Sequence, residues 1–542
     1  MGGYLSHLTP EVATHTLDAS CGPIRGNIYK HGDKIVEGYL GIPFGKPPVG
    51  ELRFAKPVPC DKWDEVKDCT SYAPKCPQNI LNPLHPSNVS EDCLALNVFR
   101  PAWESTEFAS QGRPVMVYVH GGAFEFGASS DYCAYSITGT LPLKDVVFVT
   151  IHYRLSVFGF LTTGDENCKG NFGLWDQTLA LKWIQQHIKS FGGDPNNVTV
   201  FGQSAGGVSV DFLSLSPHSR DLFHKMIPMS GGAGCEFAMR TAERQAQVFV
   251  EYAEFLGYKG SGDSKDLLEW YKSAPTELLA SHKTFNRKTV SGFLTFAPNM
   301  DGDFFPKPLE QLRKEAPKKP AIVGICEQEG LVLCYFIAQN QGNTYDMFKG
   351  KVQQTFGEDI FDNPEQIQQK VVDYYMKGID RTNEEEVKKG FSAFIGDALF
   401  NQGVFEMVQD LTKNGNQVFY YNFRYFNPES FGILESLIPF KAATHCTDLR
   451  YVLGEGVYSK FEPNEDEYKV LEFMTTTFTN FAKTGNPENP DWQPYSLDKP
   501  YTRFCINLPK SHMIDVFDKE GLKFWKELNK ENKMYNELRY GK

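Results

Sequence analysis

The sequence predicts a mixed α/β fold with a large, mostly parallel central sheet flanked by helices. Two short apolar runs, 114–119 and 145–151, are typical of strands that are buried on both faces. Over residues 174–191 the apolar positions change to helical spacing, and 197–201 is again an apolar run. Because strands and helices alternate in this way, parallel strand pairing and helices on both faces of the sheet are favoured.

The residue pattern predicts more helix in the second half of the chain than in the first half. Residues 320–325 and 418–423 are two further candidates for buried strands. Residues 236–275 have the pattern of amphipathic helices, residues 360–415 are charged and helical, and 471–481 has the pattern of a late helix. Most of these helical residues do not fit a simple strand–helix alternation, so we expect them to be insertions into the central layers.

Size and composition predict one large globular domain. The 542 residues are 41% hydrophobic, which supplies a large core, and no internal repeat or Gly/Ser-rich linker divides them. We therefore expect an N-terminal tail over 1–14 and a single domain over 15–542. The net charge of −12, without a basic cluster, disfavours nucleic acid as a partner. The 12 cysteines include no CxxC motif and no Cys/His group at zinc spacing, so a metal site is not expected.

The first residues carry a pattern for lipid attachment. The chain begins without the charged start and apolar run of a cleaved secretory signal, and no stretch reaches the roughly 18 apolar residues that span a bilayer. Met1–Ser6 fits the M-G-x-x-x-[ST] pattern for N-myristoylation at Gly2. One acyl chain gives only weak, reversible membrane binding. We therefore expect a cytoplasmic protein that is not secreted and that associates weakly with membranes if Gly2 is acylated.

The segment Gly202-Gln203-Ser204-Ala205-Gly206 is the strongest functional signal in the sequence. It lies between a predicted strand and a predicted helix, which is the context of a nucleophile elbow in the α/β-hydrolase fold. The tight turn exposes the hydroxyl of Ser204, and the flanking glycines let the strand and the helix approach each other. We therefore expect Ser204 to be the nucleophile of an α/β-hydrolase.

A serine nucleophile needs a base, and α/β-hydrolases provide it in the chain order Ser, Asp/Glu, His. The histidines that follow Ser204 are His218, His224, His282, His445 and His512. The first two lie too close to Ser204 for an acid-bearing strand to intervene, and His282 precedes the best candidate acid. His512 comes late, near a Pro-containing segment. His445, in a loop that leads into a helix, is the preferred base, although spacing alone leaves a purely structural histidine open.

The candidate acid is Glu329, just past the predicted strand over 320–325. A carboxylate at that place lies on the active-site edge of a parallel sheet. Glu327 is a nearby competitor, and chain order excludes Asp448 although it lies close to His445. For the developing oxyanion, the N–H of Ala205 and the small residues of His120-Gly121-Gly122-Ala123 are candidate donors.

The segment from Phe191-Gly192-Gly193-Asp194-Pro195 to Gly206 is similar to the active-site signature of the type-B carboxylesterases. Glu91–Val98 is similar to the second signature of that family, with Ala95 in place of the usual aromatic residue. The resemblance runs from about residue 18 to about residue 510. Further matches are Tyr39–Phe44, His152–Leu155, Gly159–Leu161, Asp301-Gly302 and Trp492.

The resemblance implies roles for the candidate residues. It places Ser204, Glu329 and His445 in a catalytic triad, and Gly122, Ala123 and Ala205 as donors of the oxyanion hole. Ala123 replaces a frequent glycine but keeps its N–H. No cofactor is implied.

The resemblance also concerns residues away from the triad. Cys76 and Cys93 are similar to the pair that forms the first disulfide of secreted members, and in a cytosolic chain we expect both to be reduced. The loop between them contains no Trp, whereas cholinesterases hold a choline-stacking Trp there. Acetylcholine is therefore not the expected substrate.

The expected activity is hydrolysis of small-molecule carboxylic esters through an acyl-enzyme on Ser204. One alternative is a catalytically silent adhesion relative, but such proteins lack the nucleophile. Another is the same triad acting on amides, thioesters or lipid esters, which the fold and the triad do not separate. Phe124, Phe126 and the region 293–296 are candidates both for an apolar acyl pocket and for plain core.

Overall fold

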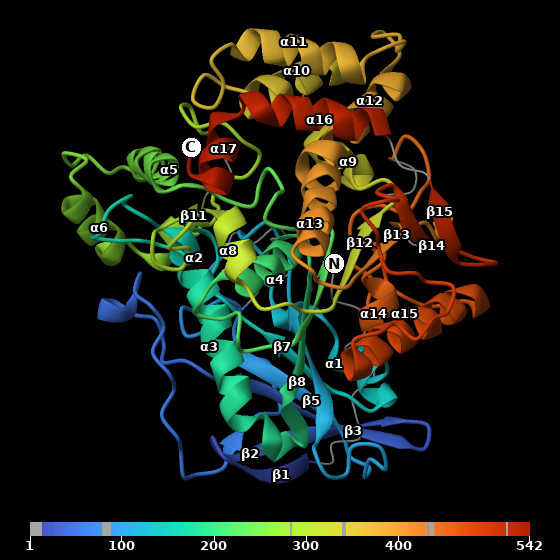
Figure 1. Cartoon of the computed structure of the whole chain (residues 1–542). Coiled ribbons are helices and arrows are strands. Elements are labelled where there is room, and N and C mark those ends of the chain that lie inside the picture. Colours follow the sequence, from blue (N-terminus) through green and yellow to red (C-terminus); the bar gives the residue numbers. More distant parts are fainter. Residues whose placement is uncertain are drawn as a thin grey trace.

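The structure, a computed structural model, describes residues 14–78, 88–281, 285–338, 343–428, 431–432, 438–515 and 519–542. A large twisted sheet runs through the molecule (Figure 1). Its strands lie in the order β1 (Thr14–Ala19), β2 (Gly22–His31), β3 (Lys34–Pro43), β5 (Ala95–Pro101), β7 (Val147–Ile151), β6 (Arg113–Val119), β8 (Gly193–Gln203), β9 (Lys225–Met229), β12 (Ala321–Cys326), β13 (Val418–Phe423), β14 (Thr502–Ile506) and β15 (His512–Asp515), with β4 (Lys67–Asp68) beside β2.

The centre of the sheet is parallel and its two ends are antiparallel. Parallel pairing runs without interruption from β7 through β6, β8, β9, β12 and β13 to β14. The antiparallel strands are β1, β2, β3 and β5 at one end and β15 at the other. The predicted mostly parallel α/β sheet is therefore confirmed, and each predicted buried strand corresponds to a strand of the parallel part.

Helices cover both faces of the sheet, because alternate strand residues enter two separate cores. On β6, Val115 and Val117 face the core that contains α3 (Phe172–His187) and α4 (Ala205–Leu215). Met116 and Tyr118 of the same strand face the opposite core, which contains α14 (Arg450–Leu453) and α15 (Glu465–Thr484). This two-sided burial explains why these strands are continuous apolar runs.

The predicted insertions are helical, and several lie together at the top of the view (Figure 1). Residues 360–415 form three helices, since Asn383 caps the second and a π turn at Asp397–Asn401 precedes the third. These are α11 (Pro364–Tyr375), α12 (Glu384–Gly396) and α13 (Gln402–Lys413). The other helices are α1 (Ala134–Thr138), α2 (Ser156–Phe160), α5 (Ala242–Phe255), α6 (Ser264–Ser273), α7 (Thr276–Leu279), α8 (Leu309–Glu315), α9 (Gly330–Ala338), α10 (Thr344–Thr355), α16 (Lys519–Glu531) and α17 (Lys533–Tyr540).

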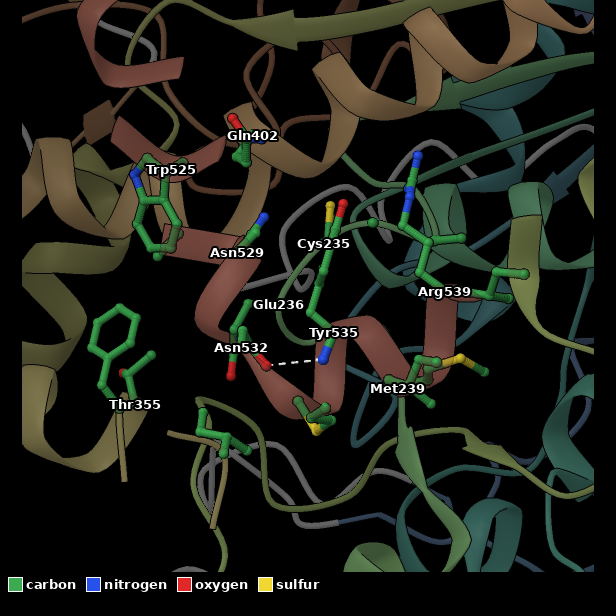
Figure 2. Close-up of a pocket in the computed structure, with 18 residues that line it drawn as sticks. Cys235, Glu236, Met239, Thr355, Gln402, Trp525, Asn529, Asn532, Tyr535 and Arg539 are labelled. Atoms are coloured by element: carbon green, nitrogen blue, oxygen red, sulfur yellow. Dashed lines mark hydrogen bonds between the residues drawn. The ribbon is translucent and has the colours of Figure 1, made fainter. Parts of the chain in front are cut away.

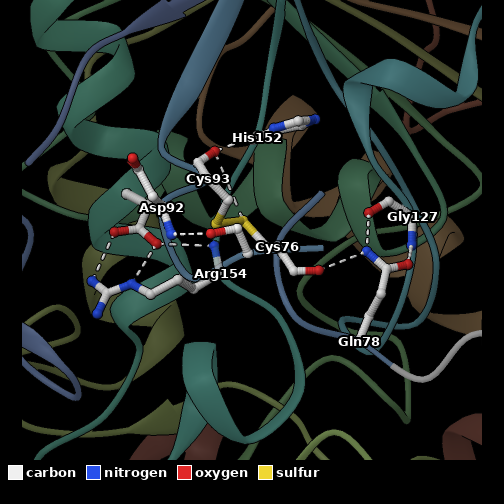
Figure 3. Close-up of a disulfide and its surroundings, with 9 residues drawn as sticks. Cys76, Gln78, Asp92, Cys93, Gly127, His152 and Arg154 are labelled. Atoms are coloured by element: carbon white, nitrogen blue, oxygen red, sulfur yellow. Dashed lines mark hydrogen bonds and ion pairs between the residues drawn. A yellow bond between two sulfur atoms is a disulfide. The ribbon is translucent and has the colours of Figure 1, made fainter. Parts of the chain in front are cut away.

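One disulfide lies close to the carboxyl end of the central strands. It joins Cys76 to Cys93, whereas a cytosolic chain was expected to keep both as thiols (Figure 3). The side chain of Gln78 then bridges two segments: its amide nitrogen donates to the carbonyl oxygens of Cys76 (3.1 Å) and Gly127 (3.0 Å), and its amide oxygen accepts from the Gly127 N–H (2.9 Å). In the part of the chain that the structure describes, no helix has the length and apolarity to cross a bilayer. The predicted tail falls outside the described residues except for Thr14, with which β1 begins.

Candidate active site

Ser204 stands at the carboxyl end of β8, on a backbone conformation that few residues adopt. Its φ of 61° and ψ of −125° turn the chain sharply between β8 and α4, which begins at the next residue. A Cβ on Gly202 would lie 2.6 Å from Gly206, and a Cβ on Gly206 would lie 2.1 Å from the Val119 carbonyl oxygen. Both positions therefore require glycine, and strain of this kind is typical of a nucleophile elbow.

Glu329 and His445 form a buried ion pair, although 116 residues separate them in the chain. Glu329 Oε2 lies 2.7 Å from His445 Nδ1, and the two side chains are almost fully enclosed. The other carboxylate oxygen accepts hydrogen bonds from the Ser230 hydroxyl and the Cys326 N–H, both at 2.6 Å. Three hydrogen bonds thus fix the orientation of this carboxylate against the imidazole ring.

The His445 ring is also held from outside the ion pair. Its loop is fastened to the segment that carries the acid, because the Gln328 N–H donates to the Ala443 carbonyl at 2.9 Å. The Phe400 ring stacks on the imidazole with a centroid distance of 4.2 Å, and the Tyr458 hydroxyl donates to the His445 carbonyl at 2.6 Å. The ring therefore has little freedom to rotate.

The competing acids lie elsewhere. Glu327 pairs with Arg424 at 3.5 Å. Asp448 accepts a hydrogen bond from the Tyr421 hydroxyl at 2.7 Å, and burial raises the pKa of its carboxyl to about 6. Neither carboxylate contacts His445, so the preference for Glu329 agrees with the geometry.

The other candidate bases are also away from the elbow. His218 lies by Asp303 and Trp175, and His224 accepts a hydrogen bond from the Val198 N–H. His512 is exposed on β15. His282 lies outside the described residues.

The contact between the elbow and the His445 ring is made by Gln203. Its amide nitrogen lies 3.2 Å from His445 Nε2 and 3.4 Å from Nδ1. Among the described residues the Ser204 hydroxyl makes no hydrogen bond, so the structure brings the ring to the elbow without closing a Ser204–His445 bond. Hydrogen bonds between a nucleophile and its base commonly tighten only when substrate binds.

Opposing effects act on the basicity of His445. Burial lowers the pKa of the imidazole, but negative charge on Cys446 and Glu329 outweighs it and raises the pKa to about 10. Glu329, which also bonds Nδ1 of the ring, is one of the two groups that hold the pKa of His445 above the value that burial alone would give.

Three main-chain N–H groups beside Ser204 are free to bind an anion. In the described part of the chain, the N–H groups of Gly122, Ala123 and Ala205 donate no hydrogen bond. Gly122 and Ala123 both have positive φ, 109° and 57°, which turns this loop back toward the elbow. A Cβ on Gly121 would lie 3.1 Å from Ser204 Cβ, so the loop passes directly over the nucleophile. The structure thus brings the three predicted donors together beside Ser204, where their N–H groups could bind an oxyanion.

The aromatic residues that were candidates for an acyl pocket differ in burial. Phe124 and Phe296 are fully buried and pack on Phe160 and Phe249, so they belong to the core. Phe126 and Phe293 are partly exposed.

A cavity that is distinct from the site lies among the 233–239 segment and helices α13, α16 and α17 (Figure 2). Residues of α8 and α10 also line it. Ser204, Glu329 and His445 are not among its lining residues. It lies behind the segment that begins at Gly231, which packs directly on the Ser204 backbone.

Comparison with known proteins decides the family. A model of the carboxylesterase family matches residues 10–525. The chain belongs to the carboxylesterase family. The carboxylesterase is 54% identical to esterase cest-33 of Caenorhabditis elegans over 556 residues, which cover 100% of this chain and 99% of the relative. It is 33% identical to the medium-chain fatty acyl-CoA hydrolase precursor of Anas platyrhynchos (96% and 93% covered) and 34% identical to human carboxylesterase 5A (87% and 82%).

Family membership gives the fold and the reaction class. The carboxylesterase has the α/β-hydrolase fold and is a serine hydrolase of carboxylic esters. Sequence reasoning had found the residues that carry this resemblance but missed four that hold them in place: Ser230, Gln203, Phe400 and Tyr458. Ser230 follows β9 at the active-site edge, which is a usable signal, whereas the other three come together only through the tertiary fold.

Proposed function

We propose that Ser204, His445 and Glu329 hydrolyse small-molecule carboxylic esters through an acyl-enzyme. His445 Nε2 takes the hydroxyl proton while Ser204 Oγ attacks the ester carbonyl carbon. The oxyanion that forms accepts hydrogen bonds from the N–H groups of Gly122, Ala123 and Ala205. The imidazolium then gives its proton to the leaving alcohol, and water repeats the sequence on the acyl-enzyme.

The buried Glu329–His445 pair beside the strained Ser204 turn is the observation that carries this proposal. A carboxylate at Nδ1 selects the tautomer whose Nε2 is free to accept a proton, and it stabilises the imidazolium that follows. The roles of Ser230 and Cys326 follow from this, because their hydrogen bonds keep Glu329 from rotating away.

Thioesters are a second candidate substrate class. One relative that spans most of this chain is described as a hydrolase of medium-chain fatty acyl-CoA. A thioester carbonyl uses the same nucleophile, the same oxyanion donors and a better leaving group. The two classes are separated by the ratio of kcat/KM for an oxygen ester and a thioester that share one acyl group.

Covalent labelling tests the nucleophile directly. A fluorophosphonate probe should add one phosphonyl group per chain, and peptide mass mapping should place it on Ser204. The label should be absent from Ser204→Ala and from protein unfolded before exposure, because only an activated hydroxyl reacts. Full labelling of Ser204→Ala, or labelling at another residue, would reject the proposal.

For location we propose the cytoplasm, with Gly2 acylated and weakly bound to membranes. Glutathione keeps cytosolic thiols reduced, so this proposal implies that Cys76 and Cys93 are thiols in the cell. The disulfide in the structure favours an oxidising compartment instead. The proposed location and the Cys76–Cys93 disulfide therefore predict different numbers of free thiols.

Counting thiols decides between them. Alkylation in denaturant at the moment of lysis, followed by intact mass, should find twelve modified cysteines if the chain is cytoplasmic. Ten modified cysteines would mean that Cys76 and Cys93 remain bonded and would reject the cytoplasmic proposal. The same spectrum shows whether Gly2 carries a myristoyl group.

A further inference from the structure

Residues 288–296 form no helix or strand, and they run from exposed residues at 288 and 289 to the buried Phe296. Backbone N–H groups that no helix or strand pairs need other partners, and six of them here are bound by side-chain carboxylates from four different parts of the chain. Hydrogen bonds run from Lys288 and Thr289 to Glu251, from Ser291 to Asp359, from Phe293 to Glu236, and from Thr295 and Phe296 to Glu125. We call residues 288–296 the carboxylate-held segment.

Glu125 differs from the other three acids because it belongs to the loop of the oxyanion hole. One oxygen of its carboxylate, Oε1, accepts the N–H of Thr295 at 3.1 Å and the N–H of Phe296 at 3.2 Å. Phe296 is fully buried and stacks on Phe249 of α5 with a centroid distance of 5.3 Å. The carboxylate of Glu125 therefore connects the oxyanion loop to a fixed point in the core.

The oxyanion loop needs such an external support. Gly122, Ala123 and Phe124 all have positive φ, and two of these three carry side chains that disfavour this conformation. Hydrogen bonds within the loop run from the N–H groups of Glu125 and Phe126 to the Gly122 carbonyl, at 2.9 and 3.0 Å. These bonds close the turn but do not fix where the turn sits relative to Ser204.

Contacts to the rest of the molecule fix that position. The Phe124 carbonyl accepts the Ser156 N–H at 2.7 Å, Gly127 is bound by Gln78, and Glu125 is bound to the carboxylate-held segment. Phe124 packs its ring on Phe160 in the core, and among these hydrogen bonds Glu125 makes the one that comes from a side chain of the turn.

We propose that Glu125 is a positioning residue that holds the Gly122 and Ala123 donors at the place where the oxyanion forms, by anchoring their loop to Thr295 and Phe296. The inference rests on the proposed function, because it concerns the oxyanion hole of that same reaction. Displacing donors by about 1 Å can cost about 10²-fold in rate. The effect should appear in the transition state rather than in substrate binding, because the donors meet full negative charge only there.

A different role for Glu125 would be to neutralise charge. Arg240 and Arg287 lie close enough that Glu125 acts on both electrostatically. Arg240 also bonds the carboxylate-held segment, through the Thr295 carbonyl at 3.2 Å. If Glu125 served only as a counter-ion, kcat would depend on the charge of its side chain and not on the length of that side chain. The two roles therefore predict different responses to Gln and Asp.

Three variants separate the effect of side-chain length from the effect of charge. Glu125→Gln keeps the length and an acceptor oxygen but removes the charge, Glu125→Asp keeps the charge but is one methylene shorter, and Glu125→Ala loses both. We expect kcat for an aryl acetate to stay within about 3-fold in Glu125→Gln, and to fall about 10-fold or more in Glu125→Asp and up to about 100-fold in Glu125→Ala. The KM should change by less than about 3-fold throughout.

Binding of a trifluoromethyl ketone supplies a readout specific to the oxyanion hole. Such a ketone adds to the serine hydroxyl and forms a tetrahedral oxyanion, so its Ki should rise in each variant by the factor by which kcat/KM falls. Glu251→Ala is the matched control. Glu251 lies on α5, and its carboxylate binds the N–H groups of Lys288 and Thr289 in the same segment. Its removal leaves the Glu125 hydrogen bonds of the oxyanion loop unchanged. The kcat and the Ki of this variant should stay close to those of the wild type.

Several outcomes would overturn the role of Glu125. They are an unchanged kcat in Glu125→Asp and Glu125→Ala, a loss in Glu125→Gln as large as that in Glu125→Ala, or an equal loss in Glu251→Ala. If Glu125→Ala does not fold, the comparison of the Gln and Asp variants decides alone. Failure of the proposed function would look different: the wild type itself would neither hydrolyse the aryl acetate nor react with fluorophosphonate, and the inference would fall with it.

Discussion

Ser204→Ala is expected to lower kcat for an aryl ester by about 10⁴-fold or more. Removing the nucleophile of a serine hydrolase typically costs up to about 10⁶, and what remains comes from the oxyanion donors and from substrate binding. The main-chain conformation at 204 also suits this test, because alanine keeps the Cβ that serine already holds at positive φ. Steady-state kinetics with the wild type prepared in parallel measure the loss.

Ser230→Ala is a suitable companion to Ser204→Ala. Ser230 is a second buried serine at the same edge of the sheet, and it also has positive φ, but its hydroxyl donates to Glu329 instead of facing the substrate. We expect a much smaller loss there, because Glu329 keeps the Cys326 N–H and His445 as partners. Turnover in Ser204→Ala at a tenth of the wild-type rate would contradict the assignment of the nucleophile.

Glu329→Gln is expected to produce the second-largest loss, about 10³–10⁴ in kcat, together with a change in pH dependence. An amide cannot stabilise the imidazolium, and it can favour the wrong tautomer. The Glu329 charge raises the pKa of His445, whereas burial lowers it. Without the charge, the neutral imidazole persists to lower pH. The acid limb of kcat/KM should therefore move toward lower pH in the variant.

Glu327→Gln provides the control for that shift. Glu327 lies two residues before Glu329 and is equally charged, but it pairs with Arg424 and is about one-third exposed. Its removal should leave both kcat and the position of the acid limb near the wild-type values. An acid limb that stays in place in Glu329→Gln, or that moves as far in Glu327→Gln, would mean that Glu329 does not set the basicity of His445.

The fold was predictable from the sequence where burial alone dictates the pattern. The parallel strands are enclosed on both faces, so residues 114–119 and 418–423 are continuous apolar runs that match β6 and β13 closely. The antiparallel strands at the amino-terminal end of the sheet were not predicted. On β2 and β3, buried and partly exposed residues mix without a clean alternation, because several other elements cover parts of these strands.

The candidate site was predictable where backbone geometry restricts residue type. The elbow glycines, the small residues of the oxyanion loop and the carboxylate after β12 each leave a local signal, since a Cβ or a different strand position would not fit. The residues that hold the His445 ring in place leave no such local signal. Phe400 and Tyr458 are ordinary aromatic residues in the sequence, and only the arrangement of α12, the π turn and the loop after α14 brings them to the imidazole.

The proposed oxyanion donors are main-chain groups, and this has a practical consequence. Two of the three residues, Ala123 and Ala205, are already alanine, and the third is Gly122. A scan that truncates every side chain to alanine would leave all three amide hydrogens in place and would score this part of the machinery as dispensable. Mapping it requires changes that act on the backbone itself, such as replacing an amide by an ester, which deletes one hydrogen and leaves the carbon skeleton intact.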